Sequence, residues 1–261
     1  MSGPEAPASP WRRRLMWGGV ILGGAALVNA GPLLRSLLPA GLEFEGLETP
    51  PGFRRLAAGG GVSTGGAGVL VGLDDGPRPP RTAEATLLGD LCARLFGGAA
   101  EAGVVPIASF SDYYCPYCRV LARRLEALEA DGGVRIAWHE WPLFGETSEA
   151  AARAALAAGR QGAYREFHDA LGTGGFVPTE AFVRDLADRL GLDAARLTAD
   201  MHAPEVDRAL ADARGLAGLF GFIGTPALVV GRTALSGAVD EATLAALVET
   251  EREAGPPPGC A

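Results

Sequence analysis

Residues 104–118 read VVPIASFSDYYCPYC, an apolar run that leads directly into a Cys-x-x-Cys pair. The apolar part, 104–110, is typical of a short strand that is buried on both faces of a sheet. After the cysteines, 119–130 repeats its apolar residues with helical spacing, and two glycines end this helix. Residues 134–141 then alternate as a second strand. Strand, helix and strand in this order predict a βαβ unit of a parallel sheet.

The rest of the chain adds helices and a hairpin to this unit. One helix is predicted before the first strand, over 82–96. The segment 146–221 carries helical signals only, with Pro, Asp or Thr opening and Gly closing each element. The predicted helices in that segment cover 147–159, 161–171, 178–190, 193–201 and 204–219. Strands are then predicted over 224–230 and 233–236, joined by a two-residue turn, with a last helix over 241–253. The predicted fold class is therefore α/β with an all-helical insertion.

The N-terminal segment is distinguished by positive charge followed by an uncharged apolar run. Arg12-Arg13-Arg14 precede residues 15–34, which carry no charge and as a helix would span about 30 Å, one bilayer core. Positive charge on this side keeps the N-terminus in the cytoplasm and places the rest of the chain outside. We favour a retained single anchor in the inner membrane. The alternative is a signal peptide cleaved after Val28-Asn29-Ala30, which leaves a soluble protein.

Three parts follow from these patterns: a signal or anchor segment over 1–36, a tether over 37–80 and a folded domain over 81–261. The tether is predicted from its many Gly and Pro residues, which prevent long regular elements. At most one short strand is expected in it, around 53–56 or 69–73.

Composition excludes several classes of function. The chain has 261 residues, 48% of them hydrophobic, which is enough for a core and excludes global disorder. A net charge of −8 argues against a nucleic-acid partner. All 23 basic residues are Arg, which excludes Schiff-base lysine chemistry and a P-loop lysine. No metal or cofactor is predicted, because zinc needs four ligands and no second cysteine pair accompanies the first.

Cys115 and Cys118 are the candidate catalytic residues. Cys115 stands where the strand ends and the helix begins, and the free amides and dipole of a helix N-terminus stabilise a thiolate. Pro116 suits the first turn, where no amide hydrogen bond is lost. We therefore expect Cys115 to be the exposed, attacking thiolate and Cys118, one turn inward, the sheltered resolving thiol. The alternatives are half of a zinc site and a purely structural disulfide.

The segment from Phe110 to Arg119 resembles the active-site segment of DsbA-type thiol:disulfide oxidoreductases of the thioredoxin superfamily. Gly224-Thr225-Pro226 before a strand resembles the cis-proline loop of that family. Gly237-Ala238-Val239 before the last helix matches the usual ending of the fold, and the helical block resembles the family's inserted domain. Together these features cover about 100–252.

This resemblance implies a thioredoxin-like fold and a set of site residues. Pro226 is expected to be cis, and the main chain of Thr225 to pair with an extended substrate peptide. Pro116 and Tyr117, between the cysteines, are expected to tune the redox potential. Some relatives carry a proton-transferring Glu six residues before the first cysteine, and Ser109 stands there in this chain. Asp112 is the nearest acid, and a capping role for it is equally open.

The function implied is that of a bacterial envelope enzyme acting in the periplasm. It would exchange disulfides with unfolded or reduced secreted proteins, as an oxidase, and be recycled by a membrane redox partner. The alternatives are a disulfide reductase or isomerase, and a membrane-tethered chaperone or binding module whose cysteines are not catalytic. Cys92 and Cys260 form a second disulfide in an oxidising compartment or remain separate thiols; the sequence leaves both open.

Overall fold

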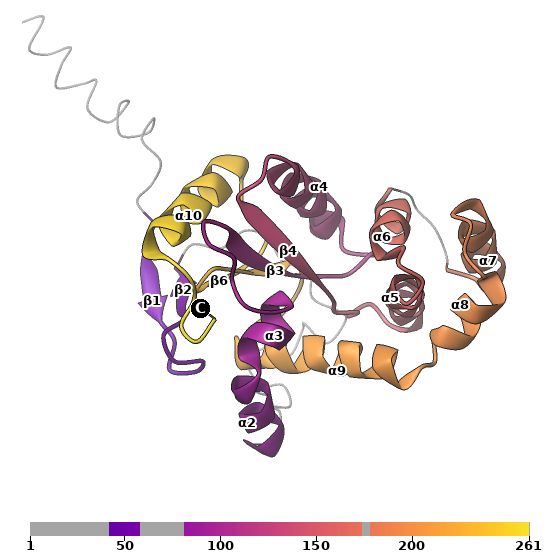
Figure 1. Ribbon diagram of the computed structural model, residues 1–261, viewed down its shortest axis with the longest axis horizontal. Coiled ribbons are helices and arrows are strands. Elements are labelled where there is room, and N and C mark those ends of the chain that lie inside the picture. The colour runs from indigo at the N-terminus through magenta and orange to yellow at the C-terminus, as the bar shows by residue number, and fades with distance from the viewer. Residues whose placement is uncertain (1–41, 58–80, 174–177, 261) are drawn as a thin grey trace, which may run out of the picture. The chain divides into compact units, whose positions relative to one another are not determined.

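The computed structural model describes residues 42–57, 81–173 and 178–260. At the centre of this part of the chain lies a six-stranded mixed sheet in the order β1-β2-β6-β5-β3-β4. Helices cover both faces of the sheet (Figure 1). The strand that leads to the cysteines, β3, is therefore an interior strand with neighbours on both sides.

The predicted βαβ unit forms the half of the sheet that carries the cysteines. β3 (Val105–Ser111) and β4 (Val134–Glu140) pair in parallel, and α4 (Pro116–Ala130) connects them. Every residue of β3 is buried, as expected for a strand with helices on both faces. The structure confirms this part of the prediction, with boundaries that differ by at most three residues.

The other half of the sheet is an antiparallel hairpin followed by a helix. β5 (Ala227–Val230) pairs with β3 and with β6 (Thr233–Ser236), antiparallel in both cases. α10 (Glu241–Ala254) follows, and the carboxylate of Asp240 caps it by accepting a hydrogen bond from the Thr243 amide. β5 brings the residues just before it, Thr225 and Pro226, to the end of β3 where the cysteines lie.

Two apolar cores lie on opposite faces of the sheet. On one face Leu121 of α4 and Leu244 of α10 pack with Ile107 of β3. On the other face Leu95 and Leu216 pack with Phe110 of β3. The helices of this second face are α2 (Arg81–Gly89), α3 (Leu91–Phe96) and α9 (Pro204–Leu219). The helix predicted over 82–96 is thus two short helices, interrupted at Asp90.

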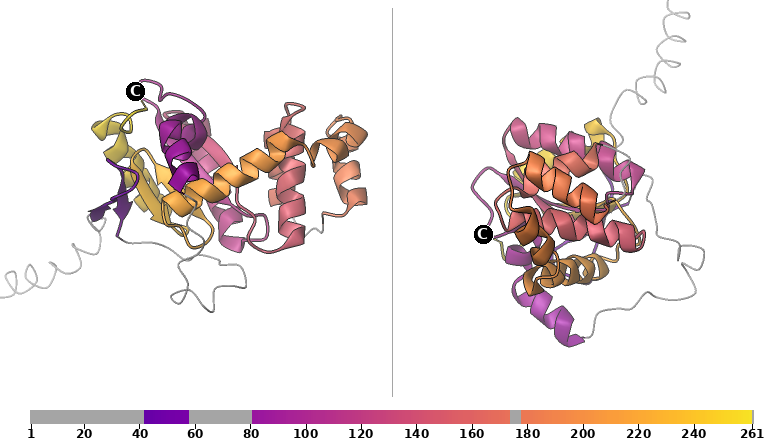
Figure 2. Two further views of the ribbon diagram at one scale, coloured as in Figure 1. Left: turned by 90° about the horizontal axis from the view of Figure 1, so that it is seen from below. Right: turned by 90° about the vertical axis from the view of Figure 1, so that its right-hand side faces the viewer.

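The predicted insertion forms a helical block with a core of its own. Its helices are α5 (Glu146–Gly159), α6 (Tyr164–Gly172), α7 (Glu180–Arg189) and α8 (Ala194–Asp200), and α9 leads back to the sheet. Figure 2 shows this block at one end of the sheet, with α9 running between the two. The small side chains of α5, among them Ala154 and Ala155, are fully buried and let its neighbours approach closely.

The first part of the predicted tether belongs to the sheet. β1 (Phe44–Gly46) and β2 (Arg54–Leu56) form a hairpin, and β2 pairs in parallel with β6. The expected strand around 53–56 is present, whereas β1 was not expected, and the candidate strand at 69–73 lies outside the described residues. The local density of Gly and Pro does not predict the pairing of β2 with β6, because Arg54 and its partner Thr233 are distant in sequence.

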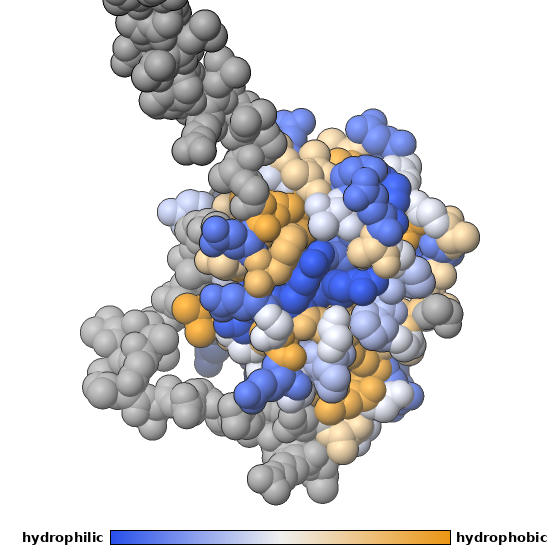
Figure 3. Space-filling view, turned by 90° about the vertical axis from the view of Figure 1, so that its left-hand side faces the viewer, coloured by the Kyte–Doolittle hydropathy of each residue, from blue (hydrophilic) through white to orange (hydrophobic). Residues whose placement is uncertain are grey.

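Side-chain contacts of Arg54 stabilise the pairing of β2 with the sheet. The Arg54 guanidinium donates to Thr233 at 2.8 Å and to the buried Glu251 carboxylate at 2.7 Å. Figure 3 views the molecule from the side of β1 and α10, where hydrophilic side chains lie between apolar ones. Polar groups and short strands limit pairing of this sheet edge with other chains.

The structure describes the C-terminal tail as far as Cys260, but it does not describe residues 1–41. The predicted anchor over 15–34 lies outside the described residues, and none of the helices described in 81–260 is long and apolar enough to cross a membrane. The C-terminal tail is fixed by a disulfide between Cys92 and Cys260. The Ala100 amide also donates to the Cys260 carbonyl at 2.8 Å. Of the two states that the sequence left open for these cysteines, the structure has the paired one.

Candidate active site

Cys115 occupies the N-terminal cap of α4, where β3 ends. Its backbone is extended, with φ −80° and ψ 115°, and Pro116 takes the first helical position. The Cys118 amide donates a hydrogen bond to the Cys115 sulfur at 3.3 Å. An amide at a helix N-terminus directed at a sulfur stabilises its thiolate form. The position predicted for the attacking cysteine is therefore one that supports an anion.

The loop before β5 faces this sulfur. The Thr225–Pro226 peptide bond is cis, as predicted. The Cys115 sulfur lies 3.4 Å from the Thr225 carbonyl oxygen, to which its thiol donates. The fold thus brings together the two motifs that the sequence analysis singled out, although they are 110 residues apart.

Cys118 lies one turn into α4 and is buried, with 5% of its surface exposed. Burial raises the pKa of the Cys118 thiol far above its ordinary value, and the neighbouring Cys115 sulfur raises this pKa further. Cys118 therefore stays protonated over the neutral range. A buried thiol that stays protonated suits the resolving role expected for Cys118.

We expect the two thiols of the reduced protein to alkylate at different rates. At about pH 6, iodoacetamide should label Cys115 well before Cys118, because only a thiolate reacts and the pKa of Cys118 is raised. Labelling of Cys118 should become appreciable only above the pH range of an ordinary thiol. Peptide mapping by mass spectrometry measures both rates. Equal labelling, or preference for Cys118, contradicts the assignment.

The exposure predicted for Cys115 is wrong. Its side chain is 0% exposed, because the sulfur turns toward the loop of Thr225 rather than toward solvent. The large apolar side chains that are exposed in the described residues lie beside it in sequence or on the facing loop: Tyr117 at 46%, Val120 at 40% and Ile223 at 56%. Exposed apolar side chains thus lie close to the cysteines in the chain and on the facing loop, whereas the Cys115 sulfur is buried.

Asp112 has a structural role in this site. Its carboxylate accepts hydrogen bonds from the amides of Tyr114 at 2.8 Å and Leu143 at 2.6 Å, and from the Ser148 hydroxyl. These contacts tie the loop before Cys115 to the start of α5. The predicted capping role of Asp112 is not the one observed, because Cys115 and not Asp112 is the N-cap of α4; Asp112 instead links two loops and the Ser148 side chain. Ser109, at the position of the relatives' Glu, is buried in β3.

His139 is a half-buried residue that packs against the apolar core. Its ring stacks on Phe110 with centroids 4.7 Å apart, and its Nε2 lies 2.9 Å from the Leu95 carbonyl. Burial lowers the pKa of His139, so the ring is neutral. Within the described ranges, no three His, Cys, Asp or Glu residues gather as a metal site would require.

Sequence reasoning missed a buried polar cluster beside the cysteines. Tyr113, Glu140, Tyr164 and His168 meet there, and none of them was predicted as a site residue. One signal was available: Glu140 continues the alternate positions of β4 that carry Val134, Ile136 and Trp138, and a carboxylate on such an apolar face needs partners.

Comparison with known proteins identifies the family. A model of the DSBA-like thioredoxin domain matches residues 106–249, more than half of the chain. The chain belongs to this family. The DSBA-like protein is accordingly a thioredoxin-fold oxidoreductase, and the matched range contains both cysteines and the cis-proline loop.

Solved structures resemble the DSBA-like protein over most of their own length. A thioredoxin-like oxidoreductase from Silicibacter pomeroyi DSS-3 is 40% identical, with a TM-score of 0.57, and the match covers 62% of this chain and 98% of that one. A periplasmic thioredoxin-like protein from Salmonella enterica serovar Typhimurium is 27% identical, with a TM-score of 0.55 and coverages of 63% and 97%. The catalytic domain of Proteus mirabilis ScsC is 25% identical, with a TM-score of 0.54 and coverages of 66% and 98%. No curated protein matches this chain.

Proposed function

We propose that the DSBA-like protein exchanges disulfides with secreted proteins in the bacterial envelope, through Cys115 and Cys118, and oxidises them. One observation carries this proposal. The Cys115 sulfur stands on the N-terminus of α4 and against the Thr225 carbonyl, with Cys118 one turn inward. This arrangement offers a stabilised thiolate, a resolving thiol and a backbone edge for the client at one place.

The exchange proceeds in two steps, each of which is a thiol–disulfide exchange. A client thiolate attacks Cys115 of the oxidised protein, so that a client–Cys115 disulfide forms, the Cys115–Cys118 bond breaks, and Cys118 leaves as a thiolate and takes up a proton. A second client thiolate then attacks the client sulfur of the mixed disulfide, and Cys115 leaves as a thiolate. Two electrons have moved from the client to the cysteine pair. The client now holds a disulfide and the enzyme a dithiol.

Client binding is assigned to the cis-proline loop and the apolar surface beside it. Thr225 and Pro226 offer backbone to an extended peptide, as in addition of a strand to a sheet edge. Tyr117, Val120 and Ile223 are exposed and apolar, which suits the side chains that an unfolded client presents. Because the Cys115 side chain is buried against the Thr225 carbonyl, binding of the client must expose it before the sulfurs meet.

Location in the envelope has independent support. The Cys92–Cys260 disulfide is of a kind that persists in oxidising compartments and is rare in the cytosol. The apolar run after Arg12-Arg13-Arg14 is that of a signal or a single inner-membrane anchor. A membrane redox partner would reoxidise the Cys115–Cys118 dithiol by accepting its two electrons.

The direction of exchange is tested by the redox potential. Stabilisation of the Cys115 thiolate favours the reduced pair, and an enzyme with a stabilised reduced form is an oxidant. We expect equilibration with glutathione to give a potential nearer about −120 mV than about −270 mV. Separation of the two forms by acid quench and alkylation measures it. A potential near the lower value would assign the reductase or isomerase role instead.

A further inference from the structure

A buried cluster of ionisable side chains lies where the active-site loop, the end of β4 and the helical block meet. The hydroxyls of Tyr113 and Tyr164 each donate to Oε1 of Glu140 at 2.6 Å. Nδ1 of His168 lies 2.7 Å from the Tyr113 hydroxyl and 3.3 Å from Oε1 of Glu140. Glu140 is 2% exposed, and its Oε2 has no hydrogen-bond partner among the described residues. Burying a carboxylate opposes folding, so this cluster calls for an explanation beyond packing.

The donors of this cluster stay protonated. Burial raises the pKa of both Tyr113 and Tyr164 well above the ordinary value, and the Glu140 carboxylate raises each pKa further. Each phenol therefore keeps its proton and directs it at Glu140. The two hydrogen bonds have the same acceptor atom and the same length, yet they come from different elements of the fold.

Tyr113 is the member of the cluster that belongs to the active site. It lies in the loop between β3 and α4, two residues before Cys115. Its ring is buried in the core of the helical block, whose other buried members all come from the helices between Glu146 and Asp200. One side chain of the active-site loop is thus inserted into the block and fastened there by Glu140.

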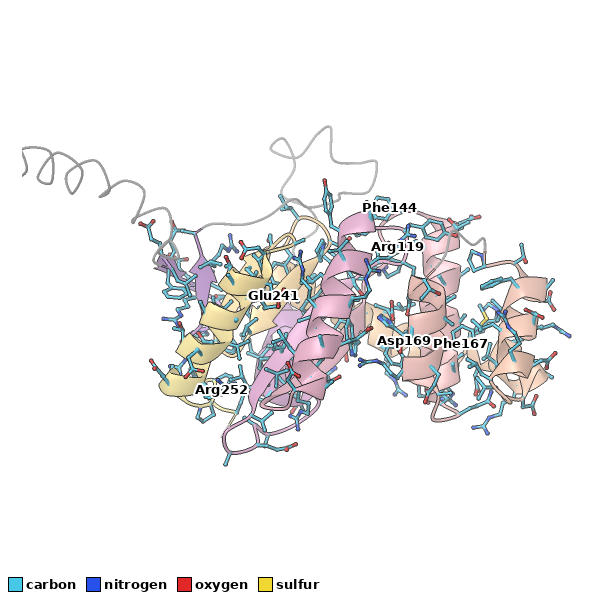
Figure 4. All side chains as sticks on the ribbon, turned by 90° about the horizontal axis from the view of Figure 1, so that it is seen from above. Arg119, Phe144, Phe167, Asp169, Glu241 and Arg252 are labelled. Carbon is cyan, nitrogen blue, oxygen red and sulfur yellow. A yellow bond between two sulfur atoms is a disulfide. The ribbon has the colours of Figure 1, made fainter. Side chains whose placement is uncertain are left out.

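The block is itself fixed to α4, the helix that begins at Cys115. Arg165 of α6 pairs with Glu129 of α4 at 2.9 Å. Figure 4 shows α6, marked by Phe167 and Asp169, beside α4, marked by Arg119. The block therefore holds α4 through this ion pair and the loop before α4 through Tyr113.

We propose that Tyr113, held by Glu140, is a positioning residue that keeps the Cys115 sulfur on the N-terminus of α4 and thereby sets the redox potential of the Cys115–Cys118 pair. This inference rests on the proposed exchange function. The Cys118 amide stabilises the Cys115 thiolate only while the loop holds the sulfur at 3.3 Å from it. Release of Tyr113 lets the loop move, weakens this contact and disfavours the reduced pair.

The test compares two matched variants, Tyr113→Phe and Tyr164→Phe. Each removes one phenol hydroxyl from the same oxygen of Glu140, but only the first releases the active-site loop. Equilibration with glutathione converts the protein disulfide and two glutathione thiols into the protein dithiol and one glutathione disulfide. We expect Tyr113→Phe to shift this equilibrium about fivefold toward the protein disulfide, or about 20 mV at about 30 mV per tenfold change. Tyr164→Phe should stay within about twofold of the wild type.

Equal shifts in the two variants, or no shift in Tyr113→Phe, would overturn the proposal. If Tyr113→Phe yields too little folded protein for equilibration, the alkylation rate of Cys115 at fixed pH in the folded fraction decides instead. That rate should be about fivefold lower than in Tyr164→Phe, in line with the loss of thiolate stabilisation, and equal rates would count against the role. Failure of the proposed function is a distinct result, since the wild type would then exchange with glutathione no faster than a variant lacking Cys115.

Discussion

Cys115→Ser is expected to abolish disulfide exchange with a reduced client protein, a loss of roughly a thousandfold or more. A hydroxyl cannot form the disulfide through which both steps pass, so only uncatalysed exchange remains. The Ser variant should keep its fold, because the two side chains have the same shape and the site is held by Asp112 and by the Thr225 loop. Recovery of activity by a reduced, denatured ribonuclease measures the rate.

Cys118→Ser should give a different result. Cys115 still attacks in this variant, but the resolving sulfur is missing, so client–Cys115 disulfides accumulate when a client disulfide is offered. Non-reducing gels should show these species, and a reductant should remove them. The variant that lacks Cys92 and Cys260 is the control and should exchange normally. Exchange or client protection that is unchanged in both Cys115→Ser and Cys118→Ser would favour a binding module with non-catalytic cysteines.

Removal of the second disulfide is expected to lower the free energy of unfolding by about 3 kcal/mol. The Cys92–Cys260 bond closes a loop with a sequence separation of 168, and long loops lose much entropy from the unfolded chain when they are closed. Cys260 is also 1% exposed within the apolar core that contains Leu95 and Phe110. Loss of the disulfide therefore removes a constraint on the unfolded chain and also exposes part of this core in the folded protein.

Urea denaturation of Cys92→Ser/Cys260→Ser measures this effect. The midpoint should fall by about 1 M relative to the wild type, given a slope of about 2–3 kcal/mol per M. Cys115→Ser/Cys118→Ser is the matched control, since it removes the same atoms from two cysteines that are only three residues apart in sequence. Its midpoint should change much less. Equal midpoints for the wild type and the Cys92/Cys260 variant would mean that this disulfide does not stabilise the fold.

Much of the fold was predictable because its signals are local. The apolar run before the cysteines, the helical spacing after them and the alternation over 134–141 each depend on neighbouring residues, and they predicted β3, α4 and β4. The helices of the inserted block were predicted for the same reason, with their caps marked by residues such as Thr179 and Asp193. The two site motifs are also short and local, so Cys115, Cys118, Thr225 and Pro226 were identified without the structure.

The sequence by itself determined the order of the elements from β3 onward, the fold class and the candidate residues of the proposed exchange site. Only the tertiary structure decided which distant groups meet. It placed β2 on the sheet through Arg54 and Glu251, joined Cys92 to Cys260 and turned the Cys115 sulfur inward. It also assembled Tyr113, Tyr164 and His168 around Glu140 from segments that carry no common local pattern. The physical reason is that burial and pairing depend on what packs from elsewhere in the chain, and periodicity along one segment does not contain that information.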